Sequence, residues 1–295
     1  MVYSLLALDL DGTLLNKAGV VTARTVAALQ RVRAAGAAVA LCSGRASYSM
    51  RGVEAQLGFA PFVVSFNGAV VHAPPRPSDN AKSSDNSADN SSDSPDNNAK
   101  TLLFRNEMTP AQVSQVLQAA NAMRRAVNYY GPDSIYCVVT SDEQRALAHR
   151  YHLLTGATYE FIDDYSIIQT LPPKMLIFGH DPDIMIKYLR ENTSGLALIK
   201  DDWFVECLPP DMNKGVGFTK LCQALNIPIE QTIAFGDGWN DMEFIAAAGT
   251  GIAMKNARQE LKDIASRITE FTNDEEGLAI ELENFLSKGL FGPKN

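Results

Sequence analysis

The sequence lacks the marks of several protein classes. It has only four cysteines, none in a CxxC spacing, and no apolar run of the roughly 18 to 20 residues that a transmembrane helix needs. Basic residues are outnumbered, with 26 Lys and Arg against 34 Asp and Glu and a net charge of −8. Without a local basic patch, so acidic a chain does not attract nucleic acid or anionic lipid. We therefore expect reduced cysteines, neither nucleic acid nor membrane as a partner, and a cytoplasmic location.

What the chain does contain is an alternation of short apolar runs with segments of helical periodicity, at both ends of the sequence. The runs that predict strands are 5–10, 37–42, 62–66, 232–236 and 251–253. The segments that predict helices are 22–36, 47–57, 214–225, 240–248 and 275–288. This alternation is typical of βαβ units around a parallel sheet, so we expect an α/β fold with a Rossmann-like core.

The middle of the chain has a different pattern, in which strands and helices follow one another in α+β order. We expect residues 71–208 to form an α+β cap domain, inserted into a discontinuous core made of residues 1–70 and 209–295. Residues 74–100 are almost only Ser, Asp, Asn, Ala, Lys and Pro. Such a composition buries too little apolar surface to offset the entropy of ordering, so we expect a disordered insertion there.

Three polar clusters follow predicted strands of the core. They are DLDGT at 9–13, SGR at 43–45 and GDGWND at 236–241. Ligands of an open parallel sheet bind at the carboxyl ends of its strands, so we expect the three clusters to meet. In the first cluster, Asp9 and Asp11 are two residues apart, and side chains with this spacing on a strand point the same way. Two carboxylates so close repel each other unless a cation lies nearby or one is protonated.

The remaining polar residues of these clusters indicate a site for a metal and a phosphate. Asp237 and Asp241 bring the number of acids to four, and oxygen ligands without Cys or His suit Mg²⁺. Ser43 offers a hydroxyl donor, and Gly44 lets backbone N–H groups approach an anion. Lys214, at the start of a predicted helix, adds a positive charge. The residues therefore predict a phosphate site opposite a nucleophile.

Together with Lys214 of MNKG, the three clusters resemble, in their order along the chain, the four motifs of the haloacid dehalogenase superfamily of phosphohydrolases. The resemblance is closest to the Cof-like branch, which carries an α/β cap between the second and third motifs. It implies a Mg²⁺-dependent phosphatase that acts on a small phosphate monoester, such as a sugar phosphate, a nucleotide or a cofactor.

The resemblance also implies a role for each motif residue. Asp9 would attack phosphorus and form an aspartyl-phosphate, and Asp11 would protonate the leaving group and then activate water. Mg²⁺ would be held by the Asp9 carboxylate, the Asp11 backbone carbonyl and the Asp237 carboxylate. The residues expected to hold the phosphoryl oxygens are Ser43, Gly44, Lys214 and Asn240. The residues expected to support the site are Gly12, Thr13 and Asp241.

Two other functions stay open on this sequence. A phosphomutase of the phosphomannomutase-like type is similar in the aspartate motif and also carries a large cap. It differs in its product, because a mutase returns a phosphorylated isomer and releases little inorganic phosphate. The other alternative is a catalytically idle sensor of a phosphate ligand, against which the intact Asp9 and Asp11 argue. Neither the substrate nor the oligomeric state is encoded in the motifs.

Overall fold

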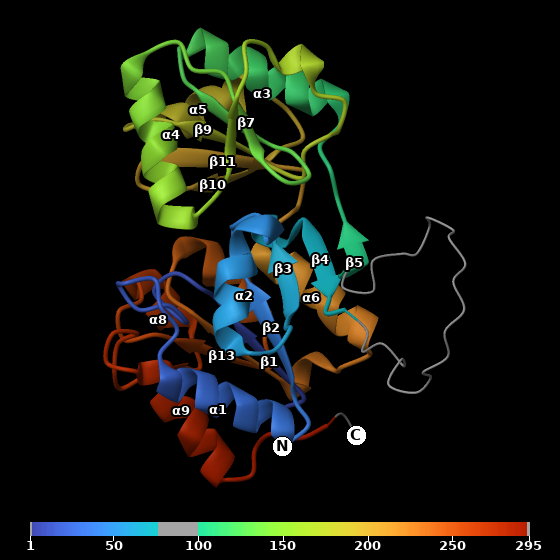
Figure 1. The fold of residues 1–295 in the computed structure, drawn as a ribbon, viewed down its shortest axis with the longest axis vertical. Helices are drawn as coiled ribbons and strands as arrows, with labels where there is room; N and C mark the ends of the chain where they lie inside the picture. Colours follow the sequence, from blue (N-terminus) through green and yellow to red (C-terminus); the bar gives the residue numbers. More distant parts are fainter. Residues whose placement is uncertain (1, 76–99, 294–295) are drawn as a thin grey trace, which may run out of the picture.

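The computed structural model describes residues 2–75 and 100–293, and it folds them around two sheets (Figure 1). Within these residues the larger sheet has eight strands in the order β14-β13-β12-β1-β2-β3-β4-β5. The smaller sheet has six in the order β10-β11-β9-β6-β7-β8. The α/β class and the parallel core are thus confirmed. The disordered insertion expected at 74–100 falls mostly on 76–99, outside the described residues.

The centre of the larger sheet is built from short, fully apolar runs. β1 (Leu5–Leu8) pairs in parallel with β12 (Thr232–Gly236) on one side and β2 (Ala38–Cys42) on the other. All four side chains of β1 are buried, as in a strand covered on both faces. The other strands of this sheet are β3 (Phe62–Ser65), β4 (Val70–Ala73), β5 (Thr101–Arg105), β13 (Thr250–Ala253) and β14 (Arg267–Ile268). Its helices are α1 (Ala23–Ala34), α2 (Arg51–Leu57), α6 (Lys214–Leu225), α7 (Met242–Ala247), α8 (Gln259–Ile264) and α9 (Gly277–Ser287).

The smaller sheet lies above the larger one in Figure 1. Among the described residues, it carries three α-helices. Its strands are β6 (Val127–Tyr130), β7 (Ile135–Cys137), β8 (Tyr159–Phe161), β9 (Met175–Phe178), β10 (Ala197–Lys200) and β11 (Phe204–Leu208). Its helices are α3 (Pro110–Ala122), α4 (Asp142–Thr155) and α5 (Pro182–Asn192). We refer to this sheet with α3, α4 and α5 as the cap.

The boundary expected at residue 71 does not match the sheets. A tight turn at Phe66–Gly68 reverses the chain, so that β4 pairs antiparallel with β3 and β5 pairs antiparallel with β4. All three residues of this turn have positive φ, including Phe66 at 53° and Asn67 at 49°. The residues up to Arg105 therefore extend the larger sheet, and we place the start of the cap after β5. β4 was not predicted from the sequence, because its apolar run follows the turn at Phe66–Gly68 so closely.

Deletion of residues 76–99 is expected to leave the melting temperature close to that of the full chain. It should also leave any activity on phosphate esters within about twofold. The reason is local, since Ala73 of β4 and Thr101 of β5 are paired partners and already hold the two ends together. Thermal unfolding and phosphate release measured on the deletion and the full chain test this. A loss of activity above tenfold would mean that the deleted segment shapes the site.

Candidate active site

Asp9 stands at the carboxyl end of β1, in the middle of the larger sheet. Its N–H donates to the carbonyl of Phe235 on β12 at 3.0 Å, and the residue is only 5% exposed. The chain then turns at Gly12, whose φ is +83°. A Cβ at Gly12 would lie 2.2 Å from Oδ2 of Asp237, so this turn requires glycine. Thr13 donates its hydroxyl to Oδ1 of Asp237 at 3.1 Å and joins the first motif to the last.

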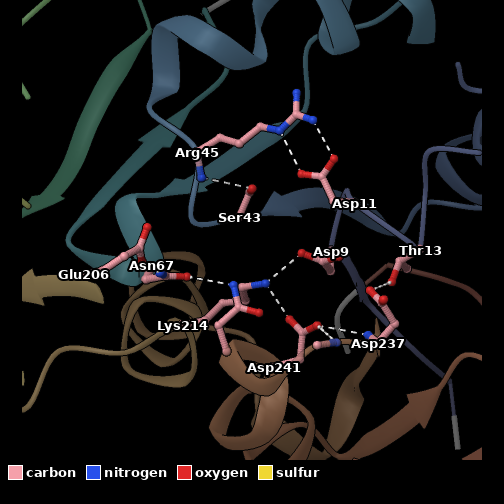
Figure 2. Close-up of polar contacts among 12 residues, drawn as sticks. Asp9, Asp11, Thr13, Ser43, Arg45, Asn67, Glu206, Lys214, Asp237 and Asp241 are labelled. Atoms are coloured by element: carbon pink, nitrogen blue, oxygen red, sulfur yellow. Dashed lines mark hydrogen bonds and ion pairs between the residues drawn. The ribbon is translucent and has the colours of Figure 1, made fainter. Parts of the chain in front are cut away.

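Lys214 is the cation of the site and is completely buried. It is the first residue of α6, whose N-terminus is capped by the side chain of Asn213. Its Nζ donates to Oδ1 of Asp9 at 2.7 Å and also to Oδ1 of Asp241, as Figure 2 shows. Burial alone would lower the pKa of Lys214, but Asp241 and Asp9 outweigh burial and raise that pKa above its ordinary value. The lysine is therefore held charged between two carboxylates.

Asp241 is buried and uses both carboxylate oxygens within the protein. Oδ1 accepts from Lys214, and Oδ2 accepts from the backbone N–H groups of Asp237 and Gly238 at 2.9 Å each. These bonds fix the loop that carries Asp237 and the position of Lys214 at the same time. Both oxygens of Asp241 therefore bind groups of the protein itself.

Three of the acids lie close enough to share one cation. Carboxylate oxygens of Asp9, Asp237 and Asp241 all lie within 4.8 Å of one another. Burial and repulsion from Asp241 raise the pKa of Asp9 well above its usual range, against the opposing effect of Lys214. Burial and Asp241 likewise raise the pKa of Asp237, to about 7. Buried acids that repel one another in this way are typical of a site that needs a further positive charge.

The residues expected to hold a phosphate come together beside these acids. Ser43 follows β2, and its hydroxyl oxygen accepts from the N–H of Arg45 at 3.1 Å. Gly44 lines the same cavity, and Asn240 donates its amide to Oδ1 of Asn67 at 3.1 Å. The structure thus places Ser43, Gly44 and Asn240 around one space, with Lys214 directly behind Asp9.

Asp11 lies on the other side of this space from Asp9 in Figure 2 and points toward Arg45. Nε of Arg45 donates to Oδ2 of Asp11 at 2.8 Å, and Nη2 donates to Oδ1 at 2.5 Å. The Asp11 side chain is 60% exposed, whereas that of Arg45 is only 12% exposed. A two-point contact of this kind fixes the direction of a carboxylate as well as its distance.

A cavity of about 380 Å³ lies between the cap and the motif residues Asp9, Ser43 and Asp237. Its floor is formed by the motif residues of the larger sheet, and its roof includes Tyr151, Trp203 and Phe204. Trp239, in the last motif, lies at the same cavity under the guanidinium of Arg258, which is 3.4 Å from the ring centre. The cavity can therefore hold a small molecule with one end at Asp9 and the other against cap side chains.

A family model of the haloacid dehalogenase-like hydrolases matches residues 6–89 and 95–282. This match covers most of the chain, motifs included. The chain belongs to this family. The expected enzyme class, a phosphoric monoester hydrolase, is also confirmed. Curated relatives that match this chain over most of its length are phosphatases.

Two of these relatives are from Bacillus subtilis. Phosphatase YwpJ is 28% identical over 96% of this chain and 99% of its own length. The 5-amino-6-(5-phospho-D-ribitylamino)uracil phosphatase YitU is 27% identical over 96% of this chain and 97% of its own length. A solved haloacid dehalogenase-like hydrolase from Bacteroides thetaiotaomicron shares the fold, with a TM-score of 0.76, 24% identity, and coverage of 96% of this chain and 99% of that one.

In this haloacid dehalogenase-like hydrolase, a buried polar group that the sequence motifs did not predict links the cap to the larger sheet. Lys174, just before β9, donates to Glu206 of β11 and, at 2.7 Å, to the carbonyl of Gly44. Glu206 also accepts from the amide of Asn67, the partner of Asn240. The available signal was a single charge in each of two apolar runs, PPKMLIF and FVECL. A charge on a buried strand requires a partner, and the two opposite charges supply each other's.

Among the residues that the structure describes, no helix is both long and apolar enough to cross a bilayer.

Proposed function

We propose that this chain is a Mg²⁺-dependent phosphatase that hydrolyses small phosphate monoesters through an aspartyl-phosphate on Asp9. The observation that carries the proposal is the contact of Asp9 with the buried Lys214 at the floor of the cavity. A carboxylate at the end of a central strand, with a charged lysine behind it and Ser43 beside it, is placed to attack a phosphoryl group whose charge those donors neutralise.

The reaction has two steps. Oδ of Asp9 forms a bond to phosphorus while the ester P–O bond breaks, and the leaving oxygen keeps the electron pair and takes a proton from Asp11. In the second step water attacks phosphorus, gives its proton to Asp11, and releases inorganic phosphate as the Asp9 P–O bond breaks. Ser43, Lys214 and Asn240 hold the phosphoryl oxygens, and the Gly44 loop keeps its backbone close to them.

The acids fit a bound Mg²⁺. Asp9 and Asp237 would hold it together with the backbone carbonyl of Asp11, because the oxygens of Asp241 already accept three hydrogen bonds. When bound, the ion supplies positive charge against both the acids and the phosphoryl oxygens. Gly12 and Thr13 support this arrangement by letting Asp237 approach the first motif closely.

The position of the cap favours a small substrate. Its side chains Tyr151, Trp203 and Phe204 line the same cavity as Asp9, so the group attached to phosphate would lie against the cap. We propose that these cap residues select among sugar, nucleotide and cofactor phosphates. The matched relatives that are named phosphatases are consistent with such substrates.

A screen of phosphate release over a broad panel of metabolites, with Mg²⁺ and purified protein, tests the proposal. At least one small monoester should be hydrolysed with release of one phosphate per ester. A phosphorylated isomer with little free phosphate would instead establish a phosphomutase. No turnover of any ester, with or without added Mg²⁺, would contradict the proposed function.

Asp11→Asn is expected to lower kcat by about 100-fold, because general acid and base catalysis contributes at least about that factor. The amide keeps the size of the side chain and cannot supply or accept the proton. Steady-state kinetics on the best ester from the panel measures the loss. The matched control is Asp263→Asn, an exposed aspartate outside the cavity lining. A reduction smaller than threefold would assign proton transfer to another group.

A further inference from the structure

We propose that Arg45 is a positioning residue that holds the carboxyl of Asp11 toward the cavity, and that the end of cap helix α4 holds Arg45. This inference rests on the proposed function, in which Asp11 protonates the leaving oxygen. It adds a residue and a physical link from the cap to the proton transfer.

The first observation is how completely the Asp11 side chain depends on Arg45. Every hydrogen bond that the structure gives to the Asp11 carboxylate, within the described residues, comes from that guanidinium, through Nε at 2.8 Å and Nη2 at 2.5 Å. The carboxylate itself is 60% exposed, so packing restrains it little. Its direction is therefore set by the planar fork of the arginine, which matches both oxygens at once.

The second observation is that the same guanidinium reaches the cap. Nη2 donates to the carbonyl of Leu154 at 3.1 Å, and Nη1 approaches the carbonyl of Thr155 at 3.4 Å. Both carbonyls belong to the last turn of α4, where carbonyls lack helical partners and carry the negative end of the helix dipole. Gly156 ends the helix there in the left-handed region, with φ at 68°.

The backbone of Arg45 is fixed to the phosphate side of the site. Its N–H donates to the hydroxyl oxygen of Ser43, and its carbonyl accepts from the N–H of Phe66 at 3.0 Å. The loop that carries the predicted phosphate ligand Ser43 therefore also carries Arg45, whose side chain binds Asp11. All three guanidinium nitrogens have an acceptor in Asp11 or α4, which disfavours Arg45 as a direct ligand of the phosphate.

A second arginine shows what an ordinary contact between the larger sheet and the cap looks like. Arg51, at the start of α2, lies 3.8 Å from Asp133 of the cap, and both side chains are more than 70% exposed. It is not among the residues that line the cavity. An exposed pair of this kind contributes little, so Arg51 is a matched control for losing one arginine between the two parts.

The test compares two esters that differ in their need for a proton. Leaving alkoxide requires protonation, whereas para-nitrophenolate leaves without it, so the alkyl ester reports on Asp11 and the aryl ester does not. The comparison uses kcat/KM, which covers the steps up to phosphoryl transfer to Asp9 and excludes the later hydrolysis. The variants are Arg45→Gln, Arg45→Lys and Arg51→Gln, each with its melting temperature.

For Arg45→Gln we expect kcat/KM to fall about 100-fold on the alkyl phosphate and less than about fivefold on para-nitrophenyl phosphate. Arg45→Lys, a point charge without the fork, should lose about tenfold on the alkyl ester. It also decides the matter should the glutamine variant fail to fold. Arg51→Gln should match the wild type on both esters.

Equal losses on the two esters, no loss, or a gain of activity in the Arg45 variants would overturn the positioning role and leave the phosphatase function standing. The proposed function would be overturned if wild-type protein released phosphate from neither of these two esters and from no ester of the metabolite panel. The role of Arg45 would then be overturned with it.

Discussion

Asp9→Asn is expected to abolish turnover, with a loss of kcat of about 10⁴-fold or more, as for the removal of other catalytic nucleophiles. The substitution is nearly isosteric, and the amide oxygen can still accept from Lys214 in place of Oδ1. The amide is, however, too weak a nucleophile to form the bond to phosphorus. Phosphate release from the best ester measures the effect, and mass spectrometry of rapidly quenched wild-type protein should detect a phosphorylated Asp9 that the variant lacks.

The matched control is Asp274→Asn, an exposed aspartate that pairs with Lys17 and does not line the cavity. It should keep wild-type kcat, which shows that the change from Asp to Asn does no general harm. Retention of more than a tenth of the activity in Asp9→Asn, at an unchanged melting temperature, would place the nucleophile elsewhere.

Chelation of divalent cations is expected to abolish turnover, and added Mg²⁺ to restore it, more effectively at pH 8 than at pH 6. In the metal-free protein, burial and Asp241 raise the pKa of Asp237 to about 7. Below that pH a proton competes for the same oxygens, so the apparent affinity for Mg²⁺ falls as the pH drops through about 7. Above it Asp237 is ionised, and the ion binds without displacing a proton from this carboxylate.

The raised pKa of Asp237 also makes the free energy of unfolding of the metal-free protein depend on pH. Between about pH 4, the ordinary pKa of an aspartate, and about pH 7, the native state binds more protons at Asp237 than the unfolded state does. In the metal-free protein this group therefore lowers the free energy of unfolding as the pH rises through that window. Bound Mg²⁺ offsets the loss, and at 100 times its Kd it adds about 2.7 kcal/mol.

Thermal unfolding with chelator and with Mg²⁺, at pH 6 and pH 8, measures both effects without an activity assay. The rise in melting temperature caused by Mg²⁺ should be larger at pH 8. Asp237→Asn should lose most of that rise, while Asp274→Asn should keep it. An equal rise at both pH values would contradict the role given to Asp237.

The parallel core could be predicted because its signals are local and repeated. Each central strand is an apolar run that ends in a polar motif, and the carboxyl ends of parallel strands meet at one edge. That rule predicts that Asp9, Ser43 and Asp237 lie together, and all three line one cavity. The boundary expected at residue 71 differs from the edge of the larger sheet for the opposite reason. The pairing of β4 with β3 depends on an unusual turn at Phe66–Gly68.

The groups that the sequence did not predict all depend on contacts between the larger sheet and the cap. Arg45 is part of the SGR motif, but the neighbouring sequence does not show that its guanidinium donates hydrogen bonds to Asp11 and to the end of α4. Lys174 and Glu206 were visible as charges among apolar residues, yet their partners Gly44 and Asn67 lie more than 100 positions away along the chain. Such pairs depend on how the cap packs against the larger sheet. The hydrophobic periodicity of each segment does not predict that packing.

The aromatic lining of the cavity allows ligand binding to be followed by the intrinsic tryptophan fluorescence of the protein. The chain contains two tryptophans, Trp203 on the cap and Trp239 on the larger sheet, and both line the cavity beside Asp9. Each ring also has an arginine over it, Arg150 at 4.2 Å and Arg258 at 3.4 Å. Tryptophan fluorescence therefore originates entirely at this cavity, with one emitter on each wall, and a ligand that enters changes the surroundings of both.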